Sequence, residues 1–345
     1  MKKFLNTITA VVLCFTVHYA NAQDLQADNM LLFQRPSGGW SKQFKGKAFS
    51  YNVQFTDEQK REIASEVSTD DANIDNESTK KEIRYLVKAY QTSRNAQYLK
   101  AVEKGIAYLL KAQYDNGGFP QYYPLKNMYR GQITYNDNAM INVLNILQDV
   151  GKKQNGFDIV NPELVEPSLK AVQKGIQCIL KTQIKVNGKL TGWCQQYDET
   201  TLQAAKARAY ELPSISASES VSIVKFLMSQ PSPSPEIINA VKGAVEWLNQ
   251  SKITGYKVAR VQASEQGSRY DRQLVLTNNT PALWARYYEI DTNKPFFSDR
   301  DGVKKYSIAD IGYERRNGYA WYGEWANTLL ERDYPEWLSK WGIAK

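Results

Sequence analysis

Three copies of one helical segment recur along the chain at nearly constant spacing, and this repeat restricts the folds that the chain can adopt. The copies begin at Ala101, Ala171 and Ala240, so successive copies start about 70 residues apart. The first two copies share the pattern Ala-Val-x-Lys-Gly-Ile, and apolar residues recur at helical spacing in all three. Such a repeat predicts a fold assembled from similar units that pack side by side.

A second amphipathic helix is predicted ahead of each copy, so the repeated unit is a pair of helices with its connecting loops. Three such pairs can close into a ring whose inner helices share one hydrophobic core. We therefore predict a mainly α fold, an (α/α)3 toroid or barrel of three helical hairpins. The three preceding helices are expected over Lys80–Thr92, Asn138–Gln148 and Glu219–Ser229.

The two ends of the chain show a different pattern. Residues 23–55 are interpreted as an extended arm that covers part of the helices. From Lys257 onward, long helical runs give way to many aromatic residues and arginines, which predicts an irregular C-terminal part with short strands. Because no low-complexity linker separates these segments, we expect residues 23–345 to form a single domain.

Residues 1–22 have the pattern of a signal peptide. Two lysines near the start are followed by an apolar run over Ile8–Val17 and then by Ala20-Asn21-Ala22, which suits a signal peptidase. We expect cleavage before Gln23 and a secreted or periplasmic protein that is free of the membrane after cleavage. An uncleaved membrane anchor is the alternative, although the apolar run is short for a bilayer span.

Three loops combine glycine with an aromatic residue at similar places in the repeat. If the repeats are equivalent, these loops lie at the same rim, where loops on a rigid scaffold commonly form the functional site. In the alternative interpretation, the glycines end the helices and the aromatic residues pack in the core. The three loop sequences are Gly38-Gly39-Trp40, Gly117-Gly118-Phe119-Pro120-Gln121 and Gly192-Trp193-Cys194-Gln195.

The histidine count excludes several kinds of site. The single histidine, His18, lies in the predicted signal peptide, so the mature protein would contain no imidazole. This excludes a Ser-His-Asp triad, a Cys-His pair and a His-ligated zinc site. A metal site would consist mainly of oxygen ligands, which favours a hard ion such as calcium.

The charge balance suits a polyanionic partner, because 44 lysines and arginines face 36 aspartates and glutamates. Nucleic acid is one such polyanion, but the chain carries no nucleic-acid-binding motif and its export argues against that partner. Of the three cysteines, Cys14 lies in the predicted signal peptide. Cys178 and Cys194 can pair in an oxidising compartment or remain as buried thiols.

Two aspartates stand next to the predicted rim. Asp137 directly precedes an apolar helix, and Asp198 follows the glycine-tryptophan loop. Asp137 is also a natural helix N-cap, which gives it a purely structural interpretation. If both carboxylates converge, they can bind calcium together with amide oxygens, or they can act as the acid and the base of a glycosidase.

A cationic cluster follows in the segment from Lys206 to Ser214. Lys206 and Arg208 are two residues apart, and an arginine fork can bind a carboxylate through two parallel hydrogen bonds. The alternative is an internal ion pair between Arg208 and Glu211. Glu219 lies in a segment that resembles a helix cap, so a structural role is expected for it.

Four longer motifs cover much of the predicted rim: Asn116–Gln121 (Asn-Gly-Gly-Phe-Pro-Gln), Tyr135–Met140 (Tyr-Asn-Asp-Asn-Ala-Met), Ala207–Ser214 (Ala-Arg-Ala-Tyr-Glu-Leu-Pro-Ser) and Leu283–Ile290 (Leu-Trp-Ala-Arg-Tyr-Tyr-Glu-Ile). They resemble those of polysaccharide lyase family 10, the pectate lyases, and the resemblance extends through most of the mature chain. It implies a secreted pectate lyase with an (α/α) toroidal core. The enzyme is expected to cleave α-1,4-polygalacturonate by calcium-assisted anti-β-elimination, to give 4,5-unsaturated oligogalacturonates.

The resemblance also implies roles for individual residues. Asp137 and Asp198 match the acidic positions near calcium. Arg272 is the best match to an arginine base and Arg208 is a second catalytic candidate, while Arg269 lies close enough in sequence to be an alternative. Tyr197 departs from the family, in which a histidine often stands at this position. The residues expected to bind substrate are Asn138, Gln121, Lys206, Arg286 and Arg316.

The chemistry of such a reaction explains these residue types. The base removes the C5 proton next to the C6 carboxylate, and cations around that carboxylate offset the negative charge that builds up. Because arginine has a pKa above 12, an arginine base predicts activity that rises far into the alkaline range. Two alternatives are a non-catalytic pectate-binding protein and a hydrolase of acidic polysaccharide on the same scaffold. We expect a monomer.

Overall fold

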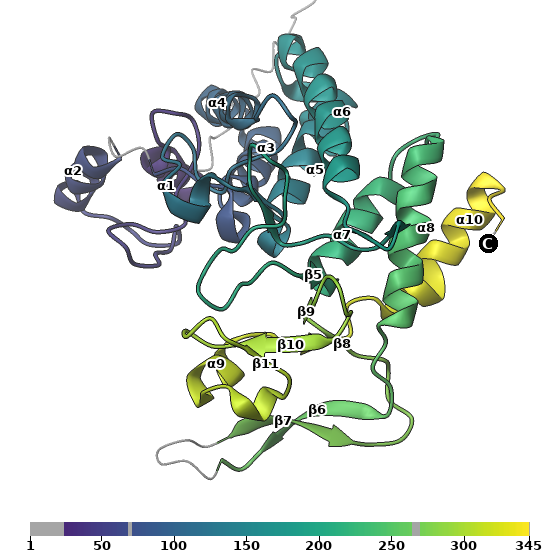
Figure 1. Cartoon of the computed structure of the whole chain (residues 1–345). Coiled ribbons are helices and arrows are strands. Elements are labelled where there is room, and N and C mark those ends of the chain that lie inside the picture. Colours follow the sequence, from purple (N-terminus) through teal and green to yellow (C-terminus); the bar gives the residue numbers. More distant parts are fainter. Residues whose placement is uncertain (1–23, 68–70, 264–269, 345) are drawn as a thin grey trace, which may run out of the picture.

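The structure is a computed structural model that describes residues 24–67, 71–263 and 270–344. The predicted signal peptide, residues 1–22, lies outside the described residues. Within those ranges, no helix combines the length and the apolar character needed to cross a membrane. Figure 1 shows a helical body, which consists of α1 to α8 with their loops, above a strand-rich part formed by residues 256–323.

Three helical hairpins make up most of the helical body, and each predicted helix is present with ends within a few residues of those expected. The inner helices α3, α5 and α7 contact one another in chain order, and the outer helices α4, α6 and α8 do the same. The prediction of a mainly α toroid is therefore confirmed. The hairpins pair α3 (Lys80–Ser93) with α4 (Ala96–Ala112), α5 (Ala139–Gly151) with α6 (Val165–Thr182), and α7 (Ala217–Met228) with α8 (Pro235–Gln250).

The start of the described chain is helical, so the prediction of an extended arm over residues 23–55 is wrong for its first third. Asp24 accepts a hydrogen bond from the backbone N–H of Ala27 and thereby caps α1 (Leu25–Phe33). α1 contacts α3 and α4 and adds one more member to the outer row. An irregular segment then leads to α2 (Asp57–Glu66), which begins with a capping box at Thr56.

One glutamine contact joins each outer helix to the next. Gln34, Gln113 and Gln183 stand at the C-terminal ends of α1, α4 and α6. Each side-chain amide donates to a carbonyl of its own loop and to a carbonyl of the next outer helix, at 2.7 to 3.0 Å. The same hydrogen bonds between neighbouring outer helices therefore recur along the chain together with the sequence repeat. The acceptors on the next helix are Ala101, Ala171 and Ala240.

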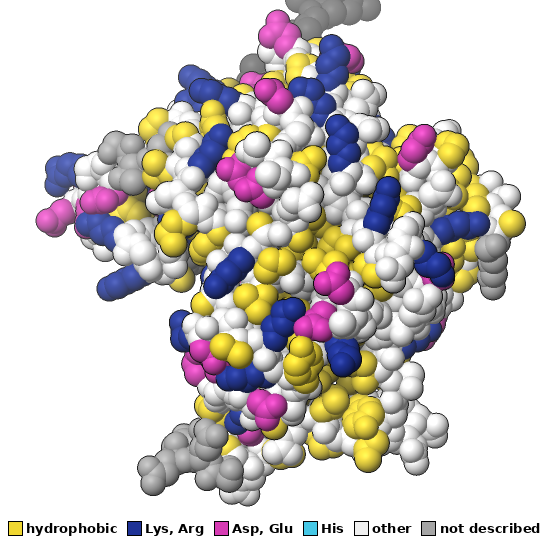
Figure 2. All heavy atoms as spheres, viewed as in Figure 1, with side chains coloured by type: hydrophobic (Ala, Val, Ile, Leu, Met, Phe, Trp, Pro, Cys, Tyr) yellow, Lys and Arg dark blue, Asp and Glu magenta, His cyan; other side chains and the backbone are white. Residues whose placement is uncertain are grey.

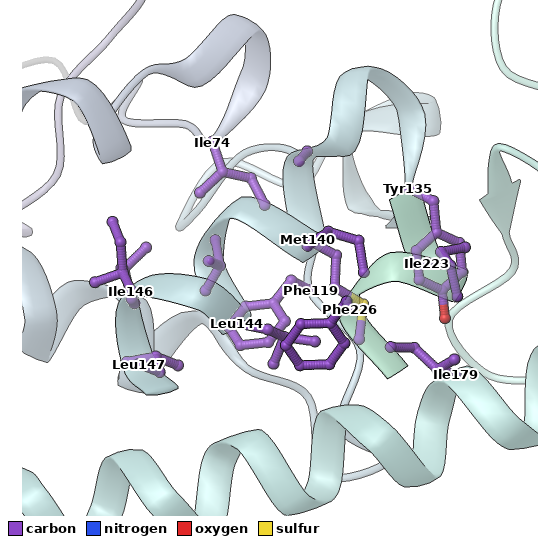
Figure 3. Packing of buried hydrophobic residues seen from close by; sticks show 14 of the residues in the cluster. Ile74, Phe119, Tyr135, Met140, Leu144, Ile146, Leu147, Ile179, Ile223 and Phe226 are labelled. Atoms are coloured by element: carbon purple, nitrogen blue, oxygen red, sulfur yellow. The ribbon is translucent and has the colours of Figure 1, made fainter. Parts of the chain in front are cut away.

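The inner helices meet in a close-packed hydrophobic core. Figure 3 shows Met140 and Leu144 of α5 beside Phe226 of α7, with Ile179 of α6 nearby. These side chains are almost fully buried. A Cβ atom added at Gly175 would lie 2.4 Å from the Leu144 side chain, so glycine allows α5 and α6 to approach closely.

The glycine-aromatic loops serve both of the roles weighed for them. Trp40, Phe119 and Trp193 are completely buried, as the core interpretation predicts. Gly117 has a φ of +91°, and a Cβ atom there would lie 2.0 Å from the Lys174 carbonyl oxygen, so only glycine fits. An equivalent buried aromatic residue without the glycine, missed in the sequence, is Trp284, whose indole donates to the last turn of α8 at 2.8 Å.

The strand-rich part is joined to the body by a small antiparallel sheet and contains a second hydrophobic cluster. β5 (Ile215–Ser216) of the body pairs with β9 (Tyr287–Tyr288), so this sheet joins the two parts. The long hairpin consists of β6 (Tyr256–Val261) and β7 (Asp271–Leu276). The other elements are β8 (Trp284–Ala285), β10 (Pro295–Ser298), β11 (Lys304–Lys305), α9 (Tyr313–Gly318) and β12 (Tyr322–Gly323).

The remaining elements are short or terminal. β1 pairs with β4 and β2 pairs with β3, both within loops of the helical body. Near the C-terminus, α10 starts next to α7, because Asp333 forms an ion pair with Lys225 at 3.2 Å. Cys178 and Cys194 are buried free thiols, so the structure shows no bond between them. The bounds are β1 (Ile133–Thr134), β2 (Lys185–Val186), β3 (Lys189–Leu190), β4 (Gln196–Tyr197) and α10 (Tyr334–Trp341).

Candidate active site

A polar cleft lies where loops of the helical body meet. Its volume is about 120 Å³, and polar groups dominate its walls. Figure 2 shows the surface indented between the helical body and the strand-rich part, with basic side chains gathered around the indentation. Larger hollows occur elsewhere, such as one of about 270 Å³ beside α8, but they bring together fewer charged side chains than the polar cleft. The cleft is lined by Lys42, Asp75, Asn76, Gln121, Tyr129, Asn136, Asp137, Gln196, Arg208 and Glu211.

The same position on each of four loops supplies a polar side chain at this rim. It is the second residue after the buried aromatic residue that follows an outer helix. Two of these side chains line the polar cleft and a third contacts Asp137 from beside it. The loops therefore do lie at one rim, as predicted. The four polar residues are Lys42, Gln121, Gln195 and Arg286, after Trp40, Phe119, Trp193 and Trp284.

Asp137 occupies an unusual backbone position at the centre of the cleft. Its φ is +50°, and the φ of the next residue, Asn138, is +62°. Asn138 is the N-cap of α5 and makes no side-chain capping bond, so the simple capping role for Asp137 is not observed. Such left-handed non-glycine residues carry strain that is often found at functional sites.

The electrostatic surroundings of Asp137 are mixed. Burial raises the pKa of its carboxyl group, and the neighbouring carboxylates of Glu219 and Asp75 raise it further, while Arg286 lowers it. Its side chain remains 42% exposed and can reach a ligand. A cation bound there would relieve the repulsion among these carboxylates.

Arg286 is held beside Asp137 by a buried carboxylate. Its Nη2 donates to Glu219 at 2.6 Å and to Asn136 at 3.3 Å, and it lies 3.7 Å from the Asp137 carboxylate. Burial alone would lower the pKa of Arg286, but Glu219 and the other anionic groups hold it well above the usual value. Glu219 also accepts a hydrogen bond from Ser216. The predicted structural role of Glu219 thus includes holding a charged residue of the site.

Arg208 forms the internal ion pair with Glu211 and still faces the cleft, so the two interpretations of this segment coexist. Its Nε donates to Glu211 at 2.7 Å, and Nη2 contacts the second carboxylate oxygen. Burial alone would lower the pKa of Arg208, but the bonded carboxylate raises it above its usual value. Lys206 is not among the residues that line the cleft, and its carbonyl accepts a hydrogen bond from Gln132.

Arg272 and Arg316 lie in a separate hollow of about 530 Å³ within the strand-rich part. Nη1 of Arg272 donates to the Tyr319 carbonyl at 3.0 Å, and within the described ranges its guanidinium has no carboxylate partner. Arg316 donates to Asp271 at 2.8 Å. Arg269, the alternative base, lies outside the described residues. In this conformation the structure does not bring Arg272 to the polar cleft.

Three other predicted positions also lie away from the cleft. Asp198 accepts hydrogen bonds from Thr201 and Thr200, which lower its pKa and tie it to a surface turn. Tyr197 is fully buried, and its hydroxyl accepts from the Cys194 backbone, so this departure from the family does not face a ligand. Asn138 lines a neighbouring shallow hollow between α5 and α7.

Several residues of the cleft were missed by sequence reasoning. Asp75 precedes α3 and forms an ion pair with Lys42, and the following Asn76 has a left-handed φ of 46°. This arrangement parallels Asp137 and Asn138 ahead of α5. The shared signal, an acidic residue followed by an asparagine shortly before each of two inner helices, could have found Asp75 and Asn76. Tyr129 and Gln196 carry no comparable signal.

Comparisons with known proteins agree with this architecture. The family model described as pectic acid lyase matches residues 34–330. The solved structure of a family 10 polysaccharide lyase from Cellvibrio cellulosa is 35% identical, covers 92% of both chains and superimposes with a TM-score of 0.77. A variant of that lyase in complex with trigalacturonic acid gives the same values. A search of curated protein sequences finds no match.

The toroid and its charged cleft, together with these matches, define a polysaccharide lyase. The chain belongs to the pectic acid lyase family, family 10 of the polysaccharide lyases, and is a pectate lyase.

Proposed function

We propose that the enzyme cleaves α-1,4-linked polygalacturonate by calcium-assisted anti-β-elimination and releases 4,5-unsaturated oligogalacturonates. The observation that carries this proposal is the arrangement of Asp137 between two arginines, Arg208 and Arg286, each held charged by a buried glutamate. The complex of the related lyase with trigalacturonic acid supports the choice of substrate. A uronate carboxylate is the ligand that such a cluster of guanidinium groups favours.

The donor atoms of the cleft suit calcium rather than a softer ion, because they are carboxylate and amide oxygens. The described residues contain no group of three or more acidic, histidine or cysteine side chains that could enclose a metal by themselves. Asp137 is therefore the carboxylate that we expect to hold the ion, and substrate and water would complete the coordination. Asp198, the second ligand implied by the resemblance, is bonded to Thr200 and Thr201 outside this cleft. When bound, calcium supplies positive charge that makes the C5 proton more acidic.

The arginines divide into two groups by their partners. Arg208 and Arg286 are bonded to glutamates, so we assign them to binding and neutralising the C6 carboxylate. Arg272 is the proposed base, because it is the one candidate without a carboxylate partner among the described residues. For proton transfer, its guanidinium must leave the Tyr319 carbonyl and reach the C5 proton on the face opposite the C4 oxygen. Water then protonates the leaving oxygen.

We further propose that the enzyme is exported and acts outside the cytoplasm, on the basis of the signal-peptide pattern of residues 1–22. N-terminal sequencing of the exported protein should begin at Gln23. A product that retains Met1 would overturn cleavage at this site.

The test of the reaction is ultraviolet absorbance of the product formed from demethylated pectate. Elimination creates a conjugated C4–C5 double bond, whereas hydrolysis or binding alone does not. We expect the signal to disappear with a chelator, to return with calcium, and to fall about 10²–10³-fold in Asp137→Asn. Saturated product ends would indicate the hydrolase alternative, and binding without products would indicate the binding protein. Activity should also increase toward alkaline pH, and a bell-shaped profile centred near pH 5 would contradict an arginine base.

A further inference from the structure

Glu211 is a buried carboxylate with more partners than a local ion pair requires. Its residue is only 1% exposed, although it lies in a loop and lines the polar cleft. One oxygen accepts from the backbone N–H of Arg208 at 3.1 Å and from its Nε at 2.7 Å. The other oxygen accepts from Nη2 of Arg208 and from the Tyr319 hydroxyl, the latter at 3.1 Å. Two side chains of the site are therefore fixed by one carboxylate.

The ion pair with Glu211 leaves Nη1 of the Arg208 guanidinium available to bind a ligand. Nε and Nη2 are used by Glu211, while the described residues offer Nη1 no hydrogen-bond acceptor. The side chain is 41% exposed, and its guanidinium also lies 5.0 Å from the ring centre of Tyr210. A planar group that is fixed on two sides can present its third nitrogen to a carboxylate in a defined direction. Because the carboxylate partner keeps this guanidinium protonated, Arg208 is suited to binding an anion and not to removing a proton.

The contact with Tyr319 connects the cleft to the strand-rich part. The Tyr319 hydroxyl lies 2.5 Å from the Tyr287 hydroxyl, which in turn contacts Gln195 of the helical body. The carbonyl of the same Tyr319 accepts the hydrogen bond from Arg272. Tyr319 therefore bonds to Glu211 through its hydroxyl group and to the proposed base, Arg272, through its backbone carbonyl.

We infer that Glu211 is a positioning residue of the lyase site, which fixes Arg208 as a charged clamp for the uronate carboxylate and fixes Tyr319, the residue against which Arg272 rests. This inference rests on the proposed elimination reaction. It assigns the alignment of the two arginines to one buried side chain that does not itself touch the substrate.

The test compares Glu211→Gln with Arg208→Ala and with the double variant, in assays of unsaturated product over a range of substrate concentration. We expect Glu211→Gln to lower kcat/KM about 10²-fold, because a small misalignment of a substrate-holding group has an effect of this size. KM should rise in both single variants. The double variant should lose less than the product of the two single effects, because the part of the Glu211 effect that acts through Arg208 is already lost in Arg208→Ala. The shape and position of the pH profile should stay as in the unmodified enzyme.

The matched control is Glu289→Gln. Glu289 is also a carboxylate with three side-chain partners, namely Thr292, Tyr306 and Lys304, but it lies outside the cleft. Its variant should keep kcat/KM within about twofold at a temperature where it is folded. If Glu211→Gln and Arg208→Ala instead have additive effects, or if kcat/KM falls only in step with the folded fraction, the positioning role is overturned. A faster reaction with a profile shifted to lower pH would show that Arg208 is the base.

Tyr319→Phe provides a second variant if Glu211→Gln fails to fold. It removes only the hydroxyl group, and we expect kcat to fall while the affinity for trigalacturonate is retained. Unchanged kcat would overturn the connection through Tyr319. Failure of the proposed function itself is distinguishable, since the unmodified enzyme would then release no unsaturated product.

Discussion

The helical body and the strand-rich part are stabilised by contacts of different kinds. In the helical body, one amide contact at Gln34, Gln113 and Gln183 and one type of buried aromatic residue recur from helix to helix. Among its described residues, the strand-rich part has one equivalent aromatic residue, Trp284, and none of these amide contacts, and its sheet depends on the pairing of β9 with the distant strand β5. Its own cluster consists of Tyr287, Phe296, Phe297, Ile308, Ile311 and Trp321.

This difference corresponds to the two roles of the molecule, stability and catalysis. Repeated contacts give the helical body its stability, and its loops carry the carboxylates and the charged pair of Arg208 and Glu211. The strand-rich part contributes Arg272, Arg286 and Tyr319, and their position depends on contacts that form only after folding brings distant segments together. Changes in the repeated helix contacts of the body should therefore act mainly on stability, and changes in the cleft loops or in the strand-rich part mainly on turnover.

The largest effect is expected at the proposed base. Arg272→Ala should lower kcat about 10²–10⁴-fold and leave the affinity for trigalacturonate and the melting temperature nearly unchanged, because general-base catalysis contributes on this scale. The control is Arg260→Ala, since Arg260 lies directly opposite Arg272 in the hairpin and is exposed. If Arg272→Ala keeps near-normal turnover, another residue is the base, and the assignment of catalysis to the strand-rich part is weakened.

In the helical body, Gly117→Ala should reduce the free energy of unfolding by about 3 kcal/mol, from the left-handed backbone together with the clash with Lys174. Gly188 separates these causes, because it has a similar φ of +79° with nothing within 4 Å of an added Cβ atom. Gly188→Ala should therefore lose only about 1 kcal/mol. Urea unfolding measures both, and equal losses would show that the close approach of the loop to α6 is unimportant.

Loss of one glutamine contact between outer helices should have a smaller effect on the free energy of unfolding. Gln113→Ala leaves two carbonyl groups without this donor and should reduce the free energy of unfolding by about 2 kcal/mol. Because Gln34 and Gln183 lie in other units, pairs of such substitutions should be nearly additive. Gln250→Ala is the control, since that exposed side chain bonds only to Glu246. Strong non-additivity in urea unfolding would mean that the units are not independent.

The smallest expected effect is a pH dependence of stability caused by the buried Glu82 in the helical body. Burial raises the pKa of Glu82, whose carboxyl accepts from the Tyr51 hydroxyl at 2.9 Å. The folded protein therefore holds this proton more tightly than the unfolded chain, so stability falls as pH rises from the ordinary glutamate pKa through the raised value. Glu82→Gln should match the unmodified protein at acidic pH and exceed it by about 1 kcal/mol at alkaline pH. Thermal unfolding at several pH values tests this, with the exposed Glu58→Gln as control. A constant difference would contradict the titration of Glu82.

The sequence predicts the features that recur and misses those that depend on a single distant contact. Periodicity located the inner and outer helices, and the loop glycines located the rim. α1 was missed because it is short and stands outside the three clear copies of the repeat. The pairing of Arg286 with Glu219 joins residues 67 positions apart and leaves no local pattern.

The candidate site shows the same limit. Asp137 and Arg208 lie in the cleft, but Asp198 is tied to its own turn by Thr200 and Thr201, which sequence spacing does not reveal. Glu211 was considered only as a local partner of Arg208. Its bond to Tyr319 spans 108 positions, so its wider role became visible only in three dimensions.

The equivalent places of Lys42, Gln121, Gln195 and Arg286 on four loops have a consequence for how enzymes of this type diversify. None of these side chains takes part in the glutamine contacts between outer helices. A substitution at Lys42 or Gln121, which line the cleft, can alter which sugar units are accepted while the architecture is inherited unchanged. Selectivity can therefore evolve one loop at a time.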